Sequence, residues 1–177
     1  MAGILLGEKS FTVDNNDSNW LQMDNIFSRK FSAYELHFND FYTQQNTNVN
    51  DIYMNLIDNT GAVKSDSTYY SARAYGRGNA DGRQASQSYS GLAYWRVAMG
   101  SYNDYFASTH MVIHTPFESN RITSFYSTDL GTTSEHYHNM RAGTYETNAC
   151  ITGFRLYSND NNEELYMGNV TVFGLGK

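Results

Sequence analysis

Histidine spacing supplies the first candidate for chemistry. His136 and His138 lie two positions apart, so both rings project from one face if this segment is extended. Around a threefold axis, three copies of such a pair would offer six nitrogens to a transition metal. Glu135 would point to the opposite face, and a His-x-His pair on a β-rich surface also occurs as two solvated rings. The pair is a candidate metal site beside that simpler interpretation, and we expect no resident cofactor.

A second histidine pair, His110 and His114, would also share one face of a strand. Their extended spacing of about 13 Å is too long for both rings to bind one ion. We therefore expect these two histidines to be surface or interface residues.

Tyrosine is abundant, with fifteen copies beside ten Phe and two Trp. Its ring gives rigid apolar contact area with a polar tip, which suits platforms that stack on sugars and subunit interfaces. Packing across neighbouring strands is the alternative use. The candidates for exposed ligand or interface positions border Gly- and Ser-rich segments and are Tyr69, Tyr75, Tyr89, Tyr102 and Tyr105.

Signatures of catalytic sites are missing from the sequence. It contains no Gly-x-Ser-x-Gly elbow and no phosphate-binding glycine motif, and Cys150 has no His near it in sequence. A glycosidase that draws its two carboxylates from distant strands stays open as an alternative, because no spacing reveals such a pair. We expect the protein not to be an enzyme.

Charge and composition limit the classes of partner that we expect. The net charge is −6, and the twelve Lys and Arg residues are scattered without a basic block, so we expect no nucleic-acid partner. The apolar run of residues 4–6 is too short for a membrane span or a signal peptide, so we expect no membrane partner either. The single cysteine excludes an internal disulfide.

The elements that position these residues are strands. Residues 34–38 alternate, with Tyr, Leu and Phe on one face and Glu35 and His37 on the other. Residues 58–61, Asp-Asn-Thr-Gly, predict a tight reversal in which Gly61 supplies a positive φ. The expected strands are 34–38, 52–56, 69–75, 93–97, 106–115, 122–127, 136–141, 151–158 and 169–175, and residues 76–84 form the longest expected loop.

These short strands, with turn signals between them and no helical repeat, predict an all-β protein. We expect a single antiparallel β-sandwich of about eight strands, jelly-roll-like in topology. Residues 18–177 would form the sandwich domain, and residues 1–17 an N-terminal arm. The arm joins an apolar tip, Ile4, Leu5 and Leu6, to a polar linker, which suits attachment to another protein.

Both ends of the chain carry a resemblance. Residues 26–38 (IFSRKFSAYELHF) and the closing segments 151–158 (ITGFRLYS) and 170–175 (VTVFGL) resemble small virion proteins of tailed bacteriophages, especially marine phages that infect cyanobacteria. In those proteins a Tyr-x-x-x-Phe strand opens the domain and a Val-x-Val-Tyr-Gly-Ile/Leu strand closes it. Phe173 stands here in place of the usual Tyr. These motifs govern packing, so the resemblance implies no catalytic residue.

The resemblance implies a non-enzymatic structural protein of a bacteriophage virion, assembled in the host cytoplasm. Such a protein would form a homo-oligomer on the capsid, as a decoration or vertex appendage, or on the tail. Its partners would be other copies of itself and phage capsid or tail proteins. The alternative is a carbohydrate-binding module of a tail or head fibre that recognises a host-surface glycan through its tyrosines.

Overall fold

The structure of the 177-residue chain is a computed structural model. It describes residues 3–12, 20–43, 51–77, 84–99, 101–102, 107–132, 136–158 and 165–176. Those residues form strands joined by turns and extended connections. No helix in these ranges is long and apolar enough to cross a membrane.

The strands of the described ranges form two sheets. In chain order they are β1 (Ile4–Thr12), β2 (Trp20–Met23), β3 (Ala33–Thr43), β4 (Asp51–Asp58), β5 (Tyr69–Arg77), β6 (Gln84–Leu92), β7 (Trp95–Met99), β8 (Ser101–Tyr102), β9 (Ala107–His114), β10 (Thr123–Thr132), β11 (His136–Tyr145), β12 (Ile151–Ser158) and β13 (Leu165–Leu175). The nine-stranded sheet has the order β1-β13-β3-β9-β10-β11-β5-β6, with the short β8 parallel to β3. The four-stranded sheet has the order β2-β12-β4-β7.

Eight of these strands follow jelly-roll topology. The first strand pairs with the last, β1 with β13, and the next pairs inward are β2 with β12, β3 with β9, and β4 with β7, all antiparallel. Successive pairs fall in alternate sheets, as in a long hairpin wrapped around a core. The predicted all-β antiparallel sandwich and its jelly-roll-like topology are therefore confirmed.

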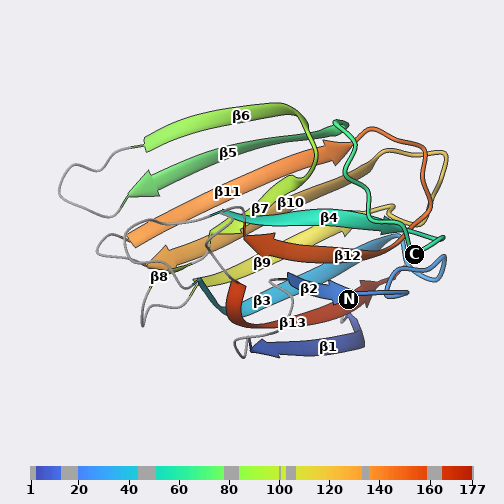
Figure 1. Ribbon diagram of the computed structural model, residues 1–177, viewed down its shortest axis with the longest axis horizontal. Helices are drawn as coiled ribbons and strands as arrows, with labels where there is room; N and C mark the ends of the chain where they lie inside the picture. Colours follow the sequence, from blue (N-terminus) through green and yellow to red (C-terminus); the bar gives the residue numbers. More distant parts are fainter. Residues whose placement is uncertain are drawn as a thin grey trace.

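Two inserted hairpins enlarge one sheet. The β5–β6 hairpin lies between β4 and β7 in sequence, and the β10–β11 hairpin lies between β9 and β12. The hairpins pair with each other through β11 and β5, so they continue the large sheet beyond β9. Figure 1 shows β5 and β6 extending past the edge of the four-stranded sheet.

Aromatic and aliphatic side chains fill the space between the sheets. Trp95, Tyr34, Tyr69, Tyr145 and Phe154 are among the largest fully buried residues. Their polar atoms are paired: the Trp95 Nε1–H donates to the carbonyl of Thr144 at 2.9 Å. Burying such rings is the main favourable term for folding. Part of the tyrosine excess of the sequence therefore belongs to the core.

Local patterns in the sequence identify most strands and miss others. The expected ranges overlap β3, β4, β5, β7 and β9 to β13, whereas β1, β2, β6 and β8 were not predicted. Gly61 has a φ of 82° in the predicted reversal, and its N–H donates to the carbonyl of Asp58 at 3.0 Å. The expected loop at 76–84 is shorter at both ends, because β5 runs to Arg77 and β6 begins at Gln84. Its residues 78–83 lie outside the described ranges.

The two ends of the chain belong to the sandwich. β12 and β13 do not pair with each other: β12 is in the four-stranded sheet and β13 in the nine-stranded one. Residues 4–12 of the expected arm form the edge strand β1, paired along β13. Leu6 packs against the core, while Ile4 and Leu5 are exposed. Residues 13–17 of that arm lie outside the described ranges.

Candidate functional site

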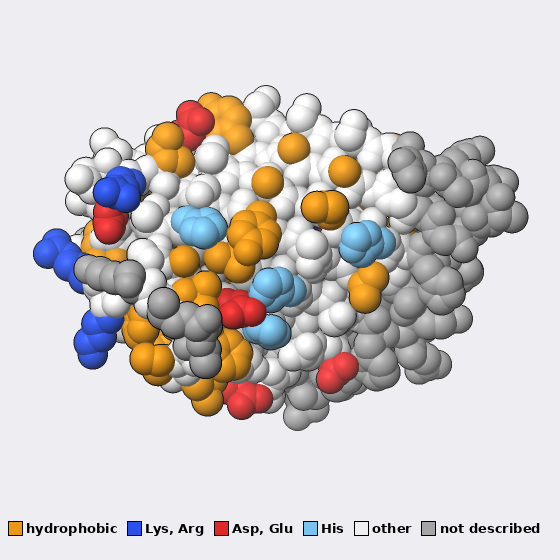
Figure 2. Space-filling view, turned by 180° about the vertical axis from the view of Figure 1, so that it is seen from behind, with side chains coloured by type: hydrophobic (Ala, Val, Ile, Leu, Met, Phe, Trp, Pro, Cys, Tyr) orange, Lys and Arg blue, Asp and Glu red, His pale blue; other side chains and the backbone are white. Residues whose placement is uncertain are grey.

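The candidate site lies on the face of the nine-stranded sheet that points away from the four-stranded sheet, which we call the outer face. Residues of alternate parity along each strand reach this face, while their neighbours point into the core. One row crosses six strands in register, and its members are His37, His110, Thr128, Met140, Ala74 and Ser86. Figure 2 shows imidazole rings on this face beside a carboxylate and a group of hydrophobic side chains.

One end of the row carries a cluster of Glu35, His37 and His110, which we call the Glu-His-His cluster. Glu35 and His37 are two apart on β3 and therefore share a face, and His110 lies directly opposite His37 on β9. Glu35 Oε1 is 3.0 Å from His37 Nε2 and 2.7 Å from His110 Nε2. The two imidazole rings have centroids 5.1 Å apart. Three potential metal ligands thus converge on one point.

The electrostatics of the cluster favour an ionised Glu35. Partial burial raises the pKa of this carboxyl, but the hydrogen bonds from His37 and His110 outweigh burial, so the net shift of the pKa is downward. About a quarter of the side chain, 28 %, is exposed, against 40 % for His37 and 41 % for His110. The cluster is therefore reachable from solvent and holds one fixed negative charge between two rings.

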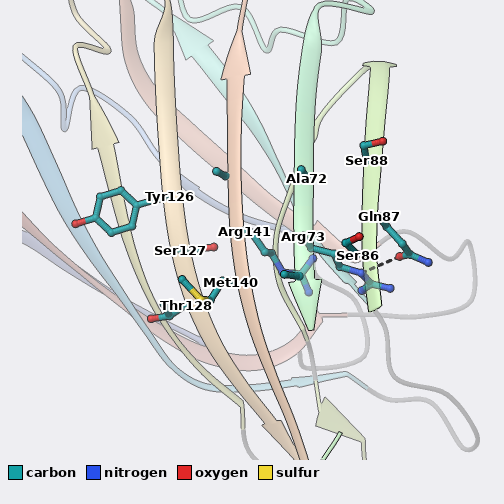
Figure 3. A pocket seen from close by; sticks show the side chains of 12 residues that line it. Ala72, Arg73, Ser86, Gln87, Ser88, Tyr126, Ser127, Thr128, Met140 and Arg141 are labelled. Atoms are coloured by element: carbon teal, nitrogen blue, oxygen red, sulfur yellow. Dashed lines mark hydrogen bonds between the residues drawn. The ribbon is translucent and has the colours of Figure 1, made fainter. Parts of the chain in front are cut away.

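The other end of the row opens into a hollow of about 670 Å³ over β10, β11, β5 and β6. Small side chains form its floor: Ala72, Ala74, Ser86, Ser88 and Ala142. Tyr126 and Met140 border the hollow and are exposed. Figure 3 shows Tyr126 from β10 and Met140 from β11 on one side, and Ser86 and Ser88 from β6 on the other. The lining mixes one aromatic ring with hydroxyl groups.

Behind the hollow, on the inner face, lies a buried polar cluster. Asp51 of β4 accepts ion pairs from Arg73, Arg96 and Arg141 at 3.3, 3.0 and 2.8 Å. Arg141 also donates from Nε to Asp129 at 2.9 Å, and neither side chain has more than 1 % exposure. Because the five charged residues come from both sheets, their ion pairs tie the inserted hairpins to the small sheet.

The predicted tyrosine candidates are distributed differently from expectation. Tyr69 was expected to be exposed, but it is fully buried, because its hydroxyl donates to the Lys64 carbonyl and accepts the Leu56 N–H. Tyr75 and Tyr89 are half-buried and lie against arginine guanidinium groups of Arg73 and Arg96 at 4.9 and 4.0 Å. The side chain of Tyr102 and the whole of Tyr105 lie outside the described part of the chain.

The structure describes the side chains of three of the four predicted histidine candidates. His138 is exposed on the outer face, opposite Leu130 of β10. The side chain of His136 is not among those described, so their pairing as metal ligands stays a prediction. His114 is exposed and its ring lies 6.0 Å from that of Tyr126. His110 was expected to be a surface or interface residue, and it lies at the surface. The other two potential metal ligands near it, Glu35 and His37, lie on β3.

Comparisons with known proteins do not assign this chain to a family. No protein-family model, no curated protein and no solved structure matches this chain.

Sequence reasoning missed the Glu-His-His cluster and the hollow. The alternation at 34–38 places Glu35 and His37 on one face, which is half of the cluster. His110 joins them only through the register of β3 with β9, and no local pattern specifies that register. No sequence pattern marked Tyr126 and Met140 as residues of a hollow, because single exposed apolar residues are common in any strand.

Proposed function

We propose that this protein is a non-enzymatic structural protein of a bacteriophage virion that assembles as a homo-oligomer on the capsid or tail. The resemblance of residues 26–38, 151–158 and 170–175 to small virion proteins supports the virion assignment. A jelly-roll sandwich with an enlarged sheet supports assembly, because repeated symmetric contacts require broad, rigid faces. Its localisation would be the virion, after synthesis in the host cytoplasm.

The observation that carries the assembly part of the proposal is the edge strand β6. Among the described residues β6 pairs only with β5, so its other side presents N–H and C=O groups. Its sequence, QASQSYSGL, contains no charged residue and no proline, the usual means by which edge strands avoid pairing with other chains. The opposite edge strand, β1, carries Glu8 and Lys9. β6 is thus the edge suited to pairing with a second copy.

The outer face beside β6 adds apolar contact area. Tyr126, Leu130 and Met140 have exposed fractions of 47 %, 56 % and 59 %. Exposed apolar side chains that gather on one face are typical of a protein interface. A second copy that extends the sheet through β6 would bring its own outer face next to this one.

The assembly part of the proposal is tested by measuring the mass of the protein in solution. Light scattering on a gel-filtration column should give a mass above that of one chain. The double variant Ser86→Lys/Ser88→Lys places two charges on β6 and should shift the protein to the monomer. The double variant Ser119→Lys/Asn120→Lys in an exposed turn adds the same charge and should not. A wild-type monomer at all concentrations would overturn the assembly proposal.

The virion part requires the particle. Peptides of this chain should be recovered by mass spectrometry from purified phage particles at a stoichiometric level. Recovery from the infected lysate but not from particles would contradict it.

The hollow favours a second candidate function, binding of a host-surface glycan. Tyr126 offers a ring for stacking, while Ser86 and Ser88 offer hydroxyl groups to sugar hydroxyls. Glycan-array binding that is lost in Tyr126→Ala and kept in Tyr75→Ala would support this candidate, because Tyr75 stacks on Arg73 on the inner face. An array without any binding would exclude it.

A further inference from the structure

The Glu-His-His cluster has the composition of a metal site. It combines two imidazoles with one carboxylate, and the three ligand atoms all lie within 4.8 Å of one another. This donor set suits Zn²⁺ and similar divalent transition metals, whereas Ca²⁺ and Mg²⁺ take oxygen ligands. The chemistry of the ligands therefore selects the class of ion.

We propose that Glu35, His37 and His110 bind a divalent transition-metal ion, with Zn²⁺ as the best-fitting ion. Two ligands of a tetrahedral Zn²⁺ ion with bonds of about 2.0–2.1 Å are separated by about 3.3 Å. The Glu35 Oε1 atom is already 3.0 and 2.7 Å from the two Nε2 atoms. A separation close to the required one means that small side-chain rotations open the space for the ion.

The backbone holds the ligands in place before any ion arrives. His37 and His110 are cross-strand partners in the middle of the large sheet, between β13 on one side and β10 on the other. Their chain neighbours Leu36 and Met111 are fully buried in the core, which fixes both strands. Phe173 packs edge-on against the His37 ring with centroids 5.6 Å apart. The site therefore requires little ordering on binding.

Proton placement changes when the ion binds. An ionised Glu35 only accepts hydrogen bonds, so in the metal-free protein a neutral ring that bonds to Oε1 through Nε2 has to carry its hydrogen on Nε2. A ring that binds the ion through Nε2 must carry its hydrogen on Nδ1 instead, and a protonated ring must release one proton to solvent. The Glu35 carboxylate then exchanges two hydrogen bonds for a bond to the metal.

Three protein ligands leave a coordination position open. The cluster lies at the surface of the sheet, and about 40 % of His37 and 41 % of His110 is exposed, so that position faces solvent. Water fills the fourth position of three-ligand zinc sites. The same position could also accept a carboxylate or imidazole from another molecule.

The test is metal titration of the full chain. Calorimetry with zinc chloride should give one site with a dissociation constant in the micromolar range. Cobalt chloride should give the visible absorption bands of a four-coordinate ion. His37→Gln, His110→Gln and Glu35→Gln should each weaken zinc binding by at least about tenfold. Circular dichroism checks that each variant stays folded, which is expected because all three side chains are partly exposed.

Two variants on the same outer face serve as controls. His114→Gln and His138→Gln remove exposed imidazoles outside the cluster, and both should bind zinc like the wild type. Wild-type protein without a zinc site would overturn the proposal, as would cluster variants that bind zinc with the affinity of the wild type. Loss of zinc binding in His138→Gln alone would also overturn it and would move the site to the His136/His138 pair.

Discussion

The two buried regions of the molecule, the apolar core and the polar cluster around Asp51, lie behind the same large sheet and differ in kind. Around Trp95 the two sheets face each other and enclose apolar side chains such as Leu36, Phe125 and Phe154. Around Asp51 the enclosed groups are the charges of Asp129 and Arg141. The change occurs along β10, which contributes Phe125 to the core and Asp129 to the cluster.

The inserted hairpins are held in a different way from the strands around the apolar core. Many apolar contacts add up without strict geometry, so a core tolerates changes of shape better than changes of polarity. The polar cluster depends on a few directed bonds that join β4, β7, β5, β10 and β11. We therefore expect the polar cluster to determine where the hairpins lie relative to the small sheet.

The largest effect is expected from Arg141→Met. Removing the guanidinium takes the one cation from the buried Asp129 among the described residues and leaves it the neutral amide of Asn139, which donates at 2.7 Å. An uncompensated buried charge costs about 3–5 kcal/mol of unfolding free energy. Urea unfolding at pH 7 measures this loss.

A double variant tests whether the uncompensated charge of Asp129 causes the loss of stability in Arg141→Met. Asp129→Asn/Arg141→Met removes both charges, and it should recover much of the stability lost in the single variant. If the double variant is less stable than the single one, the buried pair is not the reason for the loss.

Conservative substitutions should destabilise the polar cluster more than the apolar core. Arg141→Lys keeps the charge but loses the fork that reaches Asp51 and Asp129 together, at an expected cost of about 2 kcal/mol. Leu36→Met in the apolar core keeps volume and polarity and should cost less than about 1.5 kcal/mol. Denaturant midpoints with unchanged slopes would measure both. Equal losses would contradict the distinction between a directed and a non-directed region.

The sequence contains the information for one region and not for the other. Period-two patterns predicted the apolar strands, because apolar and polar residues alternate within each of these segments. β6 has no such pattern and becomes a strand because it pairs with β5. Tyr69 was expected at the surface because it borders a Ser-rich segment, and it is buried because Lys64 and Leu56, which lie outside its own strand, satisfy its hydroxyl. Contacts set by register, the Glu-His-His cluster among them, are invisible in local patterns.

The partly buried carboxylate of Asp58, whose side chain is 13 % exposed, contrasts with the fully buried carboxylate of Asp129. Asp58 accepts hydrogen bonds from the Thr60 hydroxyl and from the N–H groups of Thr60 and Ala62, and its other oxygen pairs with Lys64. The hydrogen bond from the Thr60 side chain is the largest cause of the lowered pKa of Asp58, which is about 2; partial burial raises this pKa, but the hydrogen bonds together outweigh it. A carboxyl with a lowered pKa stabilises the fold above its ordinary pKa, and this contribution is lost as the pH falls toward 2.

Asp58→Asn should therefore lose about 1–2 kcal/mol at pH 7. The difference from the wild type should shrink as the pH falls from about 4 to about 2. Urea unfolding at pH 7, pH 4 and pH 2.5 gives the comparison. A difference that stays constant over this range would mean that the ionised carboxylate is not what stabilises the turn.

The smallest effect on stability is expected on the outer face. Tyr126→Ser and Met140→Ser remove apolar groups that are about half exposed to solvent, so each should change the unfolding free energy by no more than about 0.5 kcal/mol. The same changes should weaken self-association, because apolar area on this face contributes only when another copy covers it. Sedimentation equilibrium on both variants gives the association constant, and unfolding of dilute protein gives the stability. A large loss of stability with unchanged association would mean that the side chains support the sheet itself, and the outer face would then belong with the two buried regions.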